Sequence, residues 1–289
     1  MSRRSSYQAF ALLGLLTVMV LSGCQNGFVG TVNLSIQAIP VPGVQNVFLA
    51  IKGVVLGGDG APLDLPFASE EQVDIEAGRT PILAGQIVPV SGYQSVTIQI
   101  DPANSYVIAA NGDRYPLDVA SQYQSTGDFL VGEGLTVNLL VDVDLRTALS
   151  ATTKDGVTVY TLEQNARFVD IDDTGNINGT VSTALMIGSL SVTDPDCVPA
   201  IYVYQGEGAV PEGFYVPVKG GTAPFASSSS FVLHSNQSLY TFSVTLLTPG
   251  KYTAAVTCTA ADVPGSMSIE FSPTQDAVVT AGTGTDLTF

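Results

Sequence analysis

One acidic stretch carries oxygen-bearing side chains at alternate positions, and these are Asp170, Asp172, Thr174 and Asn176. Carboxylate, hydroxyl and amide oxygens are ligands that Ca²⁺ takes, and Gly175 could supply the bend that a calcium loop needs. A loop of the EF-hand type would also require a bidentate acid at its twelfth position, where this chain has Val181. Residues 170–178 are therefore a candidate calcium site, and a solvated acidic turn is the alternative.

Asp142 and Asp144 form a second candidate group, because residues two apart on a strand point to the same face. Paired carboxylates roughly 5–10 Å apart can hydrolyse glycosidic bonds. The chain has no tryptophan to stack on a sugar, so we expect solvated strand acids that pair with Arg146 or Arg167. The one histidine, His234, cannot build a zinc site alone. The sequence therefore predicts no catalytic residue and a protein that is not an enzyme.

The most specific motif lies near the start of the chain. Arg3 and Arg4 precede an apolar run over residues 10–21, which is shorter than the roughly 20 residues that a membrane-spanning helix needs. The following Leu21-Ser22-Gly23-Cys24 resembles the lipobox of bacterial lipoproteins. The resemblance implies a signal peptide cut before Cys24, and acyl chains such as palmitate on the Cys24 thiol and the new amine. Several acyl chains together make a lasting membrane anchor.

Location and charge both follow from this reading. Gln25 stands where an aspartate would retain a Gram-negative lipoprotein in the inner membrane, which favours the outer membrane and a lipid-anchored protein of the cell envelope. The formal net charge of −16 becomes −18 when Arg3 and Arg4 are removed. Such a charge disfavours nucleic acid as a partner and disfavours electrostatic adhesion to anionic lipid.

Two cysteines remain, Cys197 and Cys258. Because an exported chain reaches an oxidising compartment, we expect them to form a disulfide, and two buried free thiols are the alternative. The loop that this bond would close is long, so the chain-entropy model gives a stabilisation of about 4 kcal/mol.

Composition and periodicity indicate an all-β protein. Hydrophobic residues make up 45% of the chain and charged residues 12%, the reverse of a disordered composition. Val32, Leu34 and Ile36 alternate with polar residues, as expected of half-buried strands, and no helical stripe of useful length occurs. We expect residues 157–162, 168–171 and 177–181 to finish a meander of strands, with the acidic stretch as one of its turns.

Residues 30–181 resemble a family of uncharacterised bacterial lipoprotein domains with a transthyretin-like or carboxypeptidase-regulatory-like β-sandwich. The segments that carry the resemblance are residues 47–55, 88–93, 96–98, 141–146, 148–149, 160–162, 167–170 and 175–181. The family usually has Asp-Ala-Pro after its first strand, whereas this chain has Ala38-Ile39-Pro40. No activity is established for the family, so the resemblance implies a fold and no reaction.

The remaining C-terminal region, residues 184–289, is similar to the same class of sandwich. In Pro249-Gly250-Lys251-Tyr252 a turn leads into a strand that a tyrosine opens, and the tyrosine hydroxyl can reach backbone at the rim. We therefore expect two tandem transthyretin-like or immunoglobulin-like β-sandwiches, in residues 30–183 and 184–289, after a signal peptide (1–23) and a lipidated tether (24–29).

The expected function is that of a binding or structural module whose loops and edge strands contact an envelope protein or a glycan. The alternative is a calcium-dependent or carbohydrate-binding module that uses residues 170–178. No cofactor is expected, apart from the calcium ion that this alternative leaves open.

Overall fold

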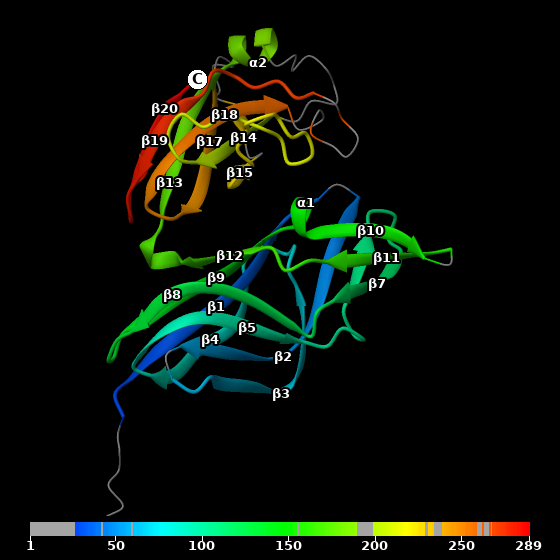
Figure 1. Ribbon diagram of the computed structural model, residues 1–289, viewed down its shortest axis with the longest axis vertical. Helices are drawn as coiled ribbons and strands as arrows, with labels where there is room; N and C mark the ends of the chain where they lie inside the picture. Colours follow the sequence, from blue (N-terminus) through cyan, green and yellow to red (C-terminus); the bar gives the residue numbers. More distant parts are fainter. Residues whose placement is uncertain are drawn as a thin grey trace, which may run out of the picture.

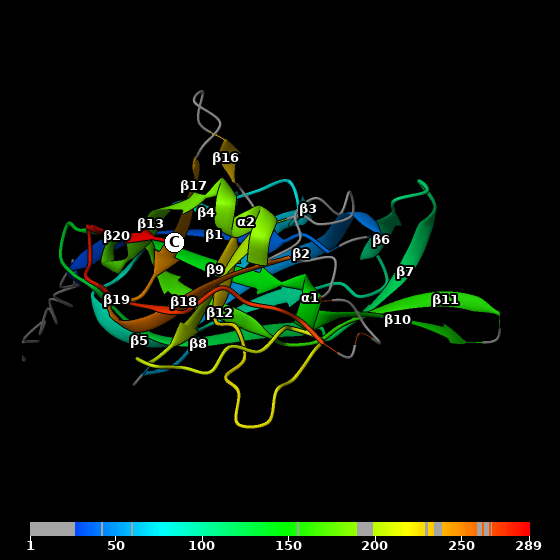
Figure 2. The same ribbon diagram turned by 90° about the horizontal axis from the view of Figure 1, so that it is seen from above.

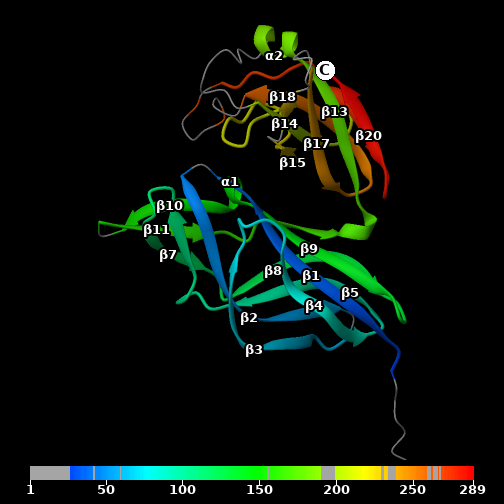
Figure 3. The same ribbon diagram turned by 180° about the vertical axis from the view of Figure 1, so that it is seen from behind.

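The computed structural model describes residues 27–41, 43–58, 60–154, 156–189, 199–228, 231–233, 239–258, 262, 266 and 268–289. Almost all regular structure is strand, gathered in two groups of sheets that follow one another along the long axis (Figures 1 and 3). The expected all-β class with two tandem sandwiches is confirmed. Among the described residues, none of the helices has the length and apolar character that crossing a bilayer requires.

The N-terminal sandwich packs a four-stranded sheet against an eight-stranded sheet. The smaller sheet has the order β12 (Ala166–Asp170), β9 (Thr136–Asp144), β1 (Val29–Ile39) and β4 (Thr80–Pro89). The larger has the order β10 (Leu149–Lys154), β11 (Val157–Leu162), β7 (Arg114–Val119), β6 (Tyr106–Ala109), β2 (Val44–Gly58), β5 (Ser91–Ile100) and β8 (Gln122–Val131), with β3 (Leu63–Asp74) paired to β2. The short helix α1 (Leu145–Ala148) links β9 to β10, and the β10–β11 hairpin extends sideways beyond the stack (Figure 2).

Alternating apolar residues make the core of this sandwich. Val32, Leu34 and Ile36 of β1 are fully buried, while Asn33 and Ser35 between them are half-buried. Burial of each such side chain stabilises the fold by about 1.5–3 kcal/mol. The expected period-two reading of this strand is therefore confirmed.

The C-terminal sandwich packs two four-stranded sheets together. One has the order β16 (Val232–Leu233), β17 (Leu239–Leu247), β13 (Gly175–Ser182) and β20 (Gly284–Thr288). The other has the order β15 (Ala226–Ser228), β14 (Pro199–Gln205), β18 (Gly250–Cys258) and β19 (Gln275–Val279). Helix α2 (Thr183–Ser189) follows β13, and Ile177, Phe242 and Val256 lie in the core between the sheets.

The expected meander does not form. β12 pairs with β9 of the first sandwich, whereas β13 pairs antiparallel with β17 and parallel with β20 of the second. The acidic stretch is therefore no hairpin turn but the connection between the sandwiches, through the 3-10 helix η1 (Ile171–Asp173). Strand pairing changes from one sandwich to the other at η1, ahead of the boundary expected at residues 183 and 184.

The two sandwiches share one arrangement of six strands. β1 pairs antiparallel with β4 and parallel with β9, and β13 likewise pairs with β17 and β20. In the facing sheets, β5 pairs antiparallel with β2 and β8, and β18 pairs antiparallel with β14 and β19. One tyrosine of each sandwich occupies a matching place, because Tyr93 donates to Pro89 O at 3.0 Å and Tyr252 donates to Thr248 O at 2.7 Å. This shared topology is what an ancient internal duplication would leave.

Candidate functional site at the junction of the sandwiches

The acids that could have formed a catalytic pair lie at the junction between the sandwiches. Arg146 holds Asp144 with two parallel hydrogen bonds, from Nε to Oδ1 at 2.9 Å and from Nη2 to Oδ2 at 2.6 Å. The guanidinium lies over the ring of Phe214, 3.7 Å from its centroid. Tyr215 donates its hydroxyl to Arg146 O at 2.7 Å, so this ion pair is bound to the C-terminal sandwich by two neighbouring aromatic residues.

Asp142 and Arg167 repeat this arrangement. Arg167 Nε donates to Asp142 Oδ2 at 3.1 Å, Nη2 contacts the same oxygen, and Gln37 Nε2 donates to Oδ1 at 3.1 Å. Arg167 also reaches the other sandwich, since its Nη1 donates to Leu246 O at 3.1 Å and its guanidinium lies 5.0 Å from the centroid of the Phe225 ring. Each arginine thus joins a carboxylate of the first sandwich to an aromatic ring of the second.

Leu246 is held in a strained backbone conformation where the sandwiches meet. Its φ is 61°, a left-handed value that costs a residue with a Cβ roughly 1–2 kcal/mol. Between the pairs Gly175–Leu247 and Ile177–Val244, β17 has one more residue than β13, so Leu246 belongs to a β-bulge. The bulge directs the Leu246 side chain into a small apolar cluster with Leu140, Val169 and Ile171.

The buried Asp262 carboxylate holds the loop that contains Phe214 and Tyr215. Asp262 accepts from the backbone N–H groups of Phe214 at 2.7 Å and Tyr215 at 2.9 Å, and from the Tyr202 hydroxyl at 2.9 Å. Burial, together with the charge of Asp262, raises the pKa of Tyr202 well above its ordinary value, so the hydroxyl stays a donor. Sequence reasoning missed this arrangement because residues 207–225 have the Gly- and Pro-rich composition of a solvated loop.

The junction explains the two acids without catalysis. Asp142 is 3% exposed, and the oxygens of both carboxylates are occupied by arginine or glutamine donors. The arginine and glutamine donors account for both carboxylates without a catalytic role. The expected pairing of Asp142 and Asp144 with Arg167 and Arg146 is confirmed, but the expectation that these acids are solvated is wrong for Asp142, which is buried under Arg167 and Gln37.

The candidate calcium ligands lie along the connection between the sandwiches. Asp170 caps η1 by accepting from Asp172 N at 3.1 Å, and Asp172 Oδ2 accepts from Asn138 Nδ2 at 2.8 Å. Thr174 donates its hydroxyl to Ile171 O at 2.8 Å. Burial raises the pKa of Asp170, and the neighbouring acids add to the effect. The described part of the chain shows no group of three or more acid, histidine or cysteine side chains placed to hold a metal, and calcium at residues 170–178 stays a prediction.

Other predicted residues fall outside the described residues. These are Cys24, Cys197 and His234, together with the signal peptide. Cys258 is the last residue of β18, and its backbone pairs with Pro199 of β14. Pro199 follows Cys197 by two residues in the sequence. The disulfide therefore stays a prediction.

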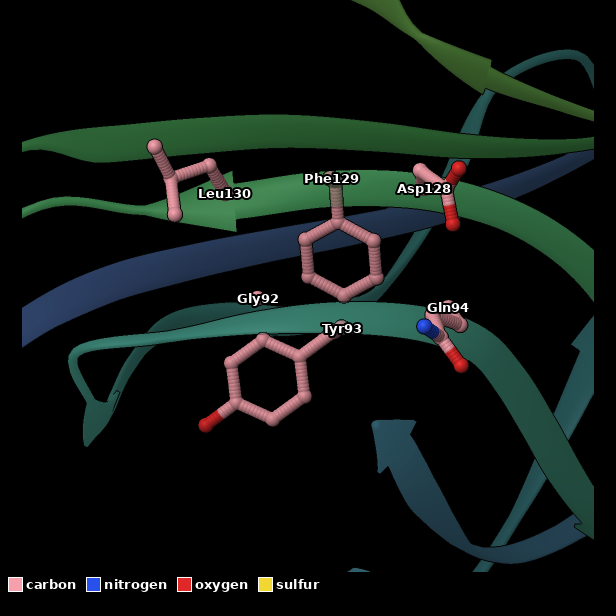
Figure 4. Close-up of a pocket in the computed structure, with 6 residues that line it drawn as sticks. All are labelled: Gly92, Tyr93, Gln94, Asp128, Phe129 and Leu130. Atoms are coloured by element: carbon pink, nitrogen blue, oxygen red, sulfur yellow. The ribbon is translucent and has the colours of Figure 1, made fainter. Parts of the chain in front are cut away.

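A shallow hollow of about 420 Å³ lies where β5 and β8 pair at the end of the N-terminal sandwich (Figure 4). The residues that line it are Gly92, Tyr93, Gln94, Asp128, Phe129 and Leu130. The Tyr93 and Phe129 rings stack with their centroids 5.2 Å apart, and burial raises the pKa of Tyr93. The titratable groups that line this hollow are the Asp128 carboxylate and the buried Tyr93 phenol.

The fold and the junction define an all-β protein of two sandwiches locked together by arginine-centred contacts. Residues 29–162 match the model of a family described as a domain of unknown function, DUF4382. The expected likeness to a domain of unknown function is confirmed over that range, and the family names no reaction. The match ends within the N-terminal sandwich, before β12. None of the curated proteins matches the chain.

Several solved structures resemble the chain weakly. A leucine-rich repeat protein from Bacteroides thetaiotaomicron is 11% identical over 91% of this chain and 26% of its own, with a TM-score of 0.23. The TIE protein of Bacillus anthracis is 12% identical over 91% and 33%, with a TM-score of 0.18. A candidate cell adhesion protein from Parabacteroides distasonis is 9% identical over 88% and 85%, with a TM-score of 0.21. The chain spans a third or less of the first two, and at these TM-scores the likeness supports no argument about function.

Proposed function

We propose that the chain is a lipid-anchored protein of the cell envelope, and that its paired sandwiches serve as a binding or structural module for protein or glycan partners. The observation that supports a non-catalytic role is the junction, where Asp142 and Asp144 are each bound by an arginine. Their role is to join two sandwiches into one elongated body. The support for the anchor is the lipobox-like sequence that ends at Cys24.

The C-terminal sandwich offers a surface for a partner. β19 is an edge strand of its sheet, and Val278 on this strand is 57% exposed. Thr285 Oγ1 donates to Val278 O at 2.6 Å, so an extended segment of another protein would add a strand through the other backbone groups of this edge. This surface suits a protein partner, while the loops between strands suit either a protein or a glycan.

The anchor is tested by the intact mass of the protein purified from membranes. We expect the mass of residues 24–289 plus acyl chains, and the Cys24→Ser variant should lose these chains and leave the membrane fraction. A wild-type mass without lipid would overturn the anchor.

The binding role is tested by a photo-crosslinking amino acid placed at Val278 and, as a control, at the exposed Val157 of the β10–β11 hairpin. A discrete crosslinked species from position 278 that position 157 does not give supports a partner at the edge strand. Turnover of a glycoside by the wild type, lost in both Asp142→Asn and Asp144→Asn, would contradict the proposal.

A further inference from the structure

Large apolar side chains gather, exposed to water, at one end of the N-terminal sandwich. We name this group the apolar rim, and its members are Phe28, Val29, Ile87, Val90, Leu130 and Leu135. Backbone contacts hold its segments together, because Val90 N donates to Phe28 O at 2.9 Å and Gly134 N donates to Val29 O at 2.9 Å. The turn between β4 and β5, the turn between β8 and β9, and the start of β1 therefore form one continuous end of the sandwich (Figure 1).

The rim is too exposed to belong to the core. Phe28 is 67% exposed, Ile87 64%, Leu130 71% and Leu135 63%. Ile87 lies next to the buried Val88 in β4, and Leu130 lies between the buried Phe129 and Val131 in β8, so both side chains point outward from their sheets. The exposed side chains of the rim thus belong to both sheets at one end of the sandwich. Exposed apolar side chains gathered in this way mark a site that contacts a partner or a membrane.

The position of Cys24 favours a membrane. Phe28 follows Cys24 by four residues in the sequence. An extended chain covers at most about 3.5 Å per residue, so a lipid on Cys24 would be held within about 14 Å of Phe28. The end of the sandwich that carries the rim is then the end that must face the bilayer.

We propose that the apolar rim contacts the lipid surface to which the chain is anchored, with its side chains inserted among the headgroups. This inference rests on the lipid anchor of the proposed function. The exposed acids at the same end, Asp128 and Glu133, repel anionic lipid, so the contact is apolar and requires no negative surface charge.

The contact sets the orientation of the molecule. The C-terminal sandwich lies at the opposite end of the long axis from the start of β1 (Figures 1 and 3). With the rim on the membrane, the β19 edge strand and the loops of the second sandwich project away from the lipid. An anchor without the rim contact would leave the body free to rotate about its tether.

The absence of tryptophan from the sequence gives a direct test. A single tryptophan is introduced as Leu135→Trp in the rim or, as the matched control, as Val278→Trp in β19; both positions are exposed. The lipidated full chain is reconstituted in phosphatidylcholine vesicles whose acyl chains carry bromine, and its intact mass and circular dichroism are recorded on the same samples. We expect blue-shifted and bromine-quenched emission from Leu135→Trp, and emission unchanged by bromine from Val278→Trp.

The outcomes separate the anchor from the rim. Lipidated protein with neither position quenched overturns the rim contact and leaves the anchor standing, and equal quenching of both positions overturns the proposed orientation. Protein without lipid in the mass spectrum overturns the anchor and the inference together. Replacing part of the phosphatidylcholine with phosphatidylglycerol should not increase quenching, and a strong increase would contradict an apolar contact.

Discussion

Arg167 of the first sandwich donates a hydrogen bond to the carbonyl of Leu246 in the second, at 3.1 Å. The acceptor belongs to a left-handed residue in a bulge, and its side chain is buried against the first sandwich. Strained backbone persists only where surrounding contacts hold it. The Arg167 hydrogen bond and the apolar cluster around Leu246 provide such contacts. We infer that these contacts between the sandwiches hold the backbone of the bulge, and that the bulge places Leu246 where it can make them.

Removing the arginine should destabilise the protein strongly. Arg167→Met leaves Asp142 buried without its cation, and breaking a buried pair in this way costs about 3–5 kcal/mol. The free energy of unfolding, measured by urea titration, should fall accordingly. The matched control is Lys251→Met, which breaks the exposed Lys251–Glu207 pair at 2.6 Å. Because exposed ion pairs contribute little, the control should unfold as the wild type does, and equal losses in both variants would refute the structural role of Arg167.

The two tyrosines at matching places should both stabilise the fold through their hydroxyls. Tyr93→Phe and Tyr252→Phe each remove a hydrogen bond to the carbonyl four residues earlier, and Tyr252→Phe also removes the hydrogen bond of 3.0 Å with Thr248 Oγ1. We expect each to lower the free energy of unfolding by about 1 kcal/mol. Tyr160→Phe is the control, since the Tyr160 hydroxyl has no hydrogen-bond partner among the described residues. A loss in the control as large as in the other two variants would show that the Tyr93 and Tyr252 hydrogen bonds to backbone carbonyls do not stabilise the fold.

Features that depend on a local pattern of residues could be predicted from the sequence. Alternation over Val32, Leu34 and Ile36 identified a strand because burial on one face requires a period of two. The ion pairs of Asp142 and Asp144 were also anticipated, since arginines lie nearby in the chain. The Asp144–Arg146 pair is local, whereas the Asp142–Arg167 pair forms because β12 lies beside β9.

Long-range pairing was beyond the sequence. The pattern of residues 177–181 identifies a strand but not its partner, and β13 pairs with β17 and β20, which come much later in the chain. The aromatic residues Phe214 and Tyr215 were missed for a related reason. Their loop is ordered by Asp262, and no local rule links residues so far apart.

Glu76 should make stability depend on pH. Burial raises the pKa of this carboxyl, and its buried Oε1 has no hydrogen-bond partner among the described residues. Because the pKa is raised in the folded protein, the protonated Glu76 carboxyl favours folding, and this stabilisation is fully present below the ordinary pKa of 4.5. It is lost as the pH rises through the pKa of the folded state. Glu76→Gln should therefore melt at a higher temperature than the wild type at pH 7 and at nearly the same temperature at pH 4. A difference that is the same at both pH values would exclude titration of Glu76 as the cause.

The place of β13 inside the second sandwich can be tested through Gly179. A Cβ at this position would lie 2.5 Å from Leu287 O of β20 and 2.5 Å from the ring of Phe242 in β17. Since the neighbouring backbone cannot yield easily, Gly179→Ala should lower the free energy of unfolding by about 1–3 kcal/mol. Gly92→Ala is the control, because a Cβ there meets nothing within 4 Å. If β13 instead continued a meander of the first sandwich, β20 and β17 would not flank Gly179, and the two variants would unfold alike.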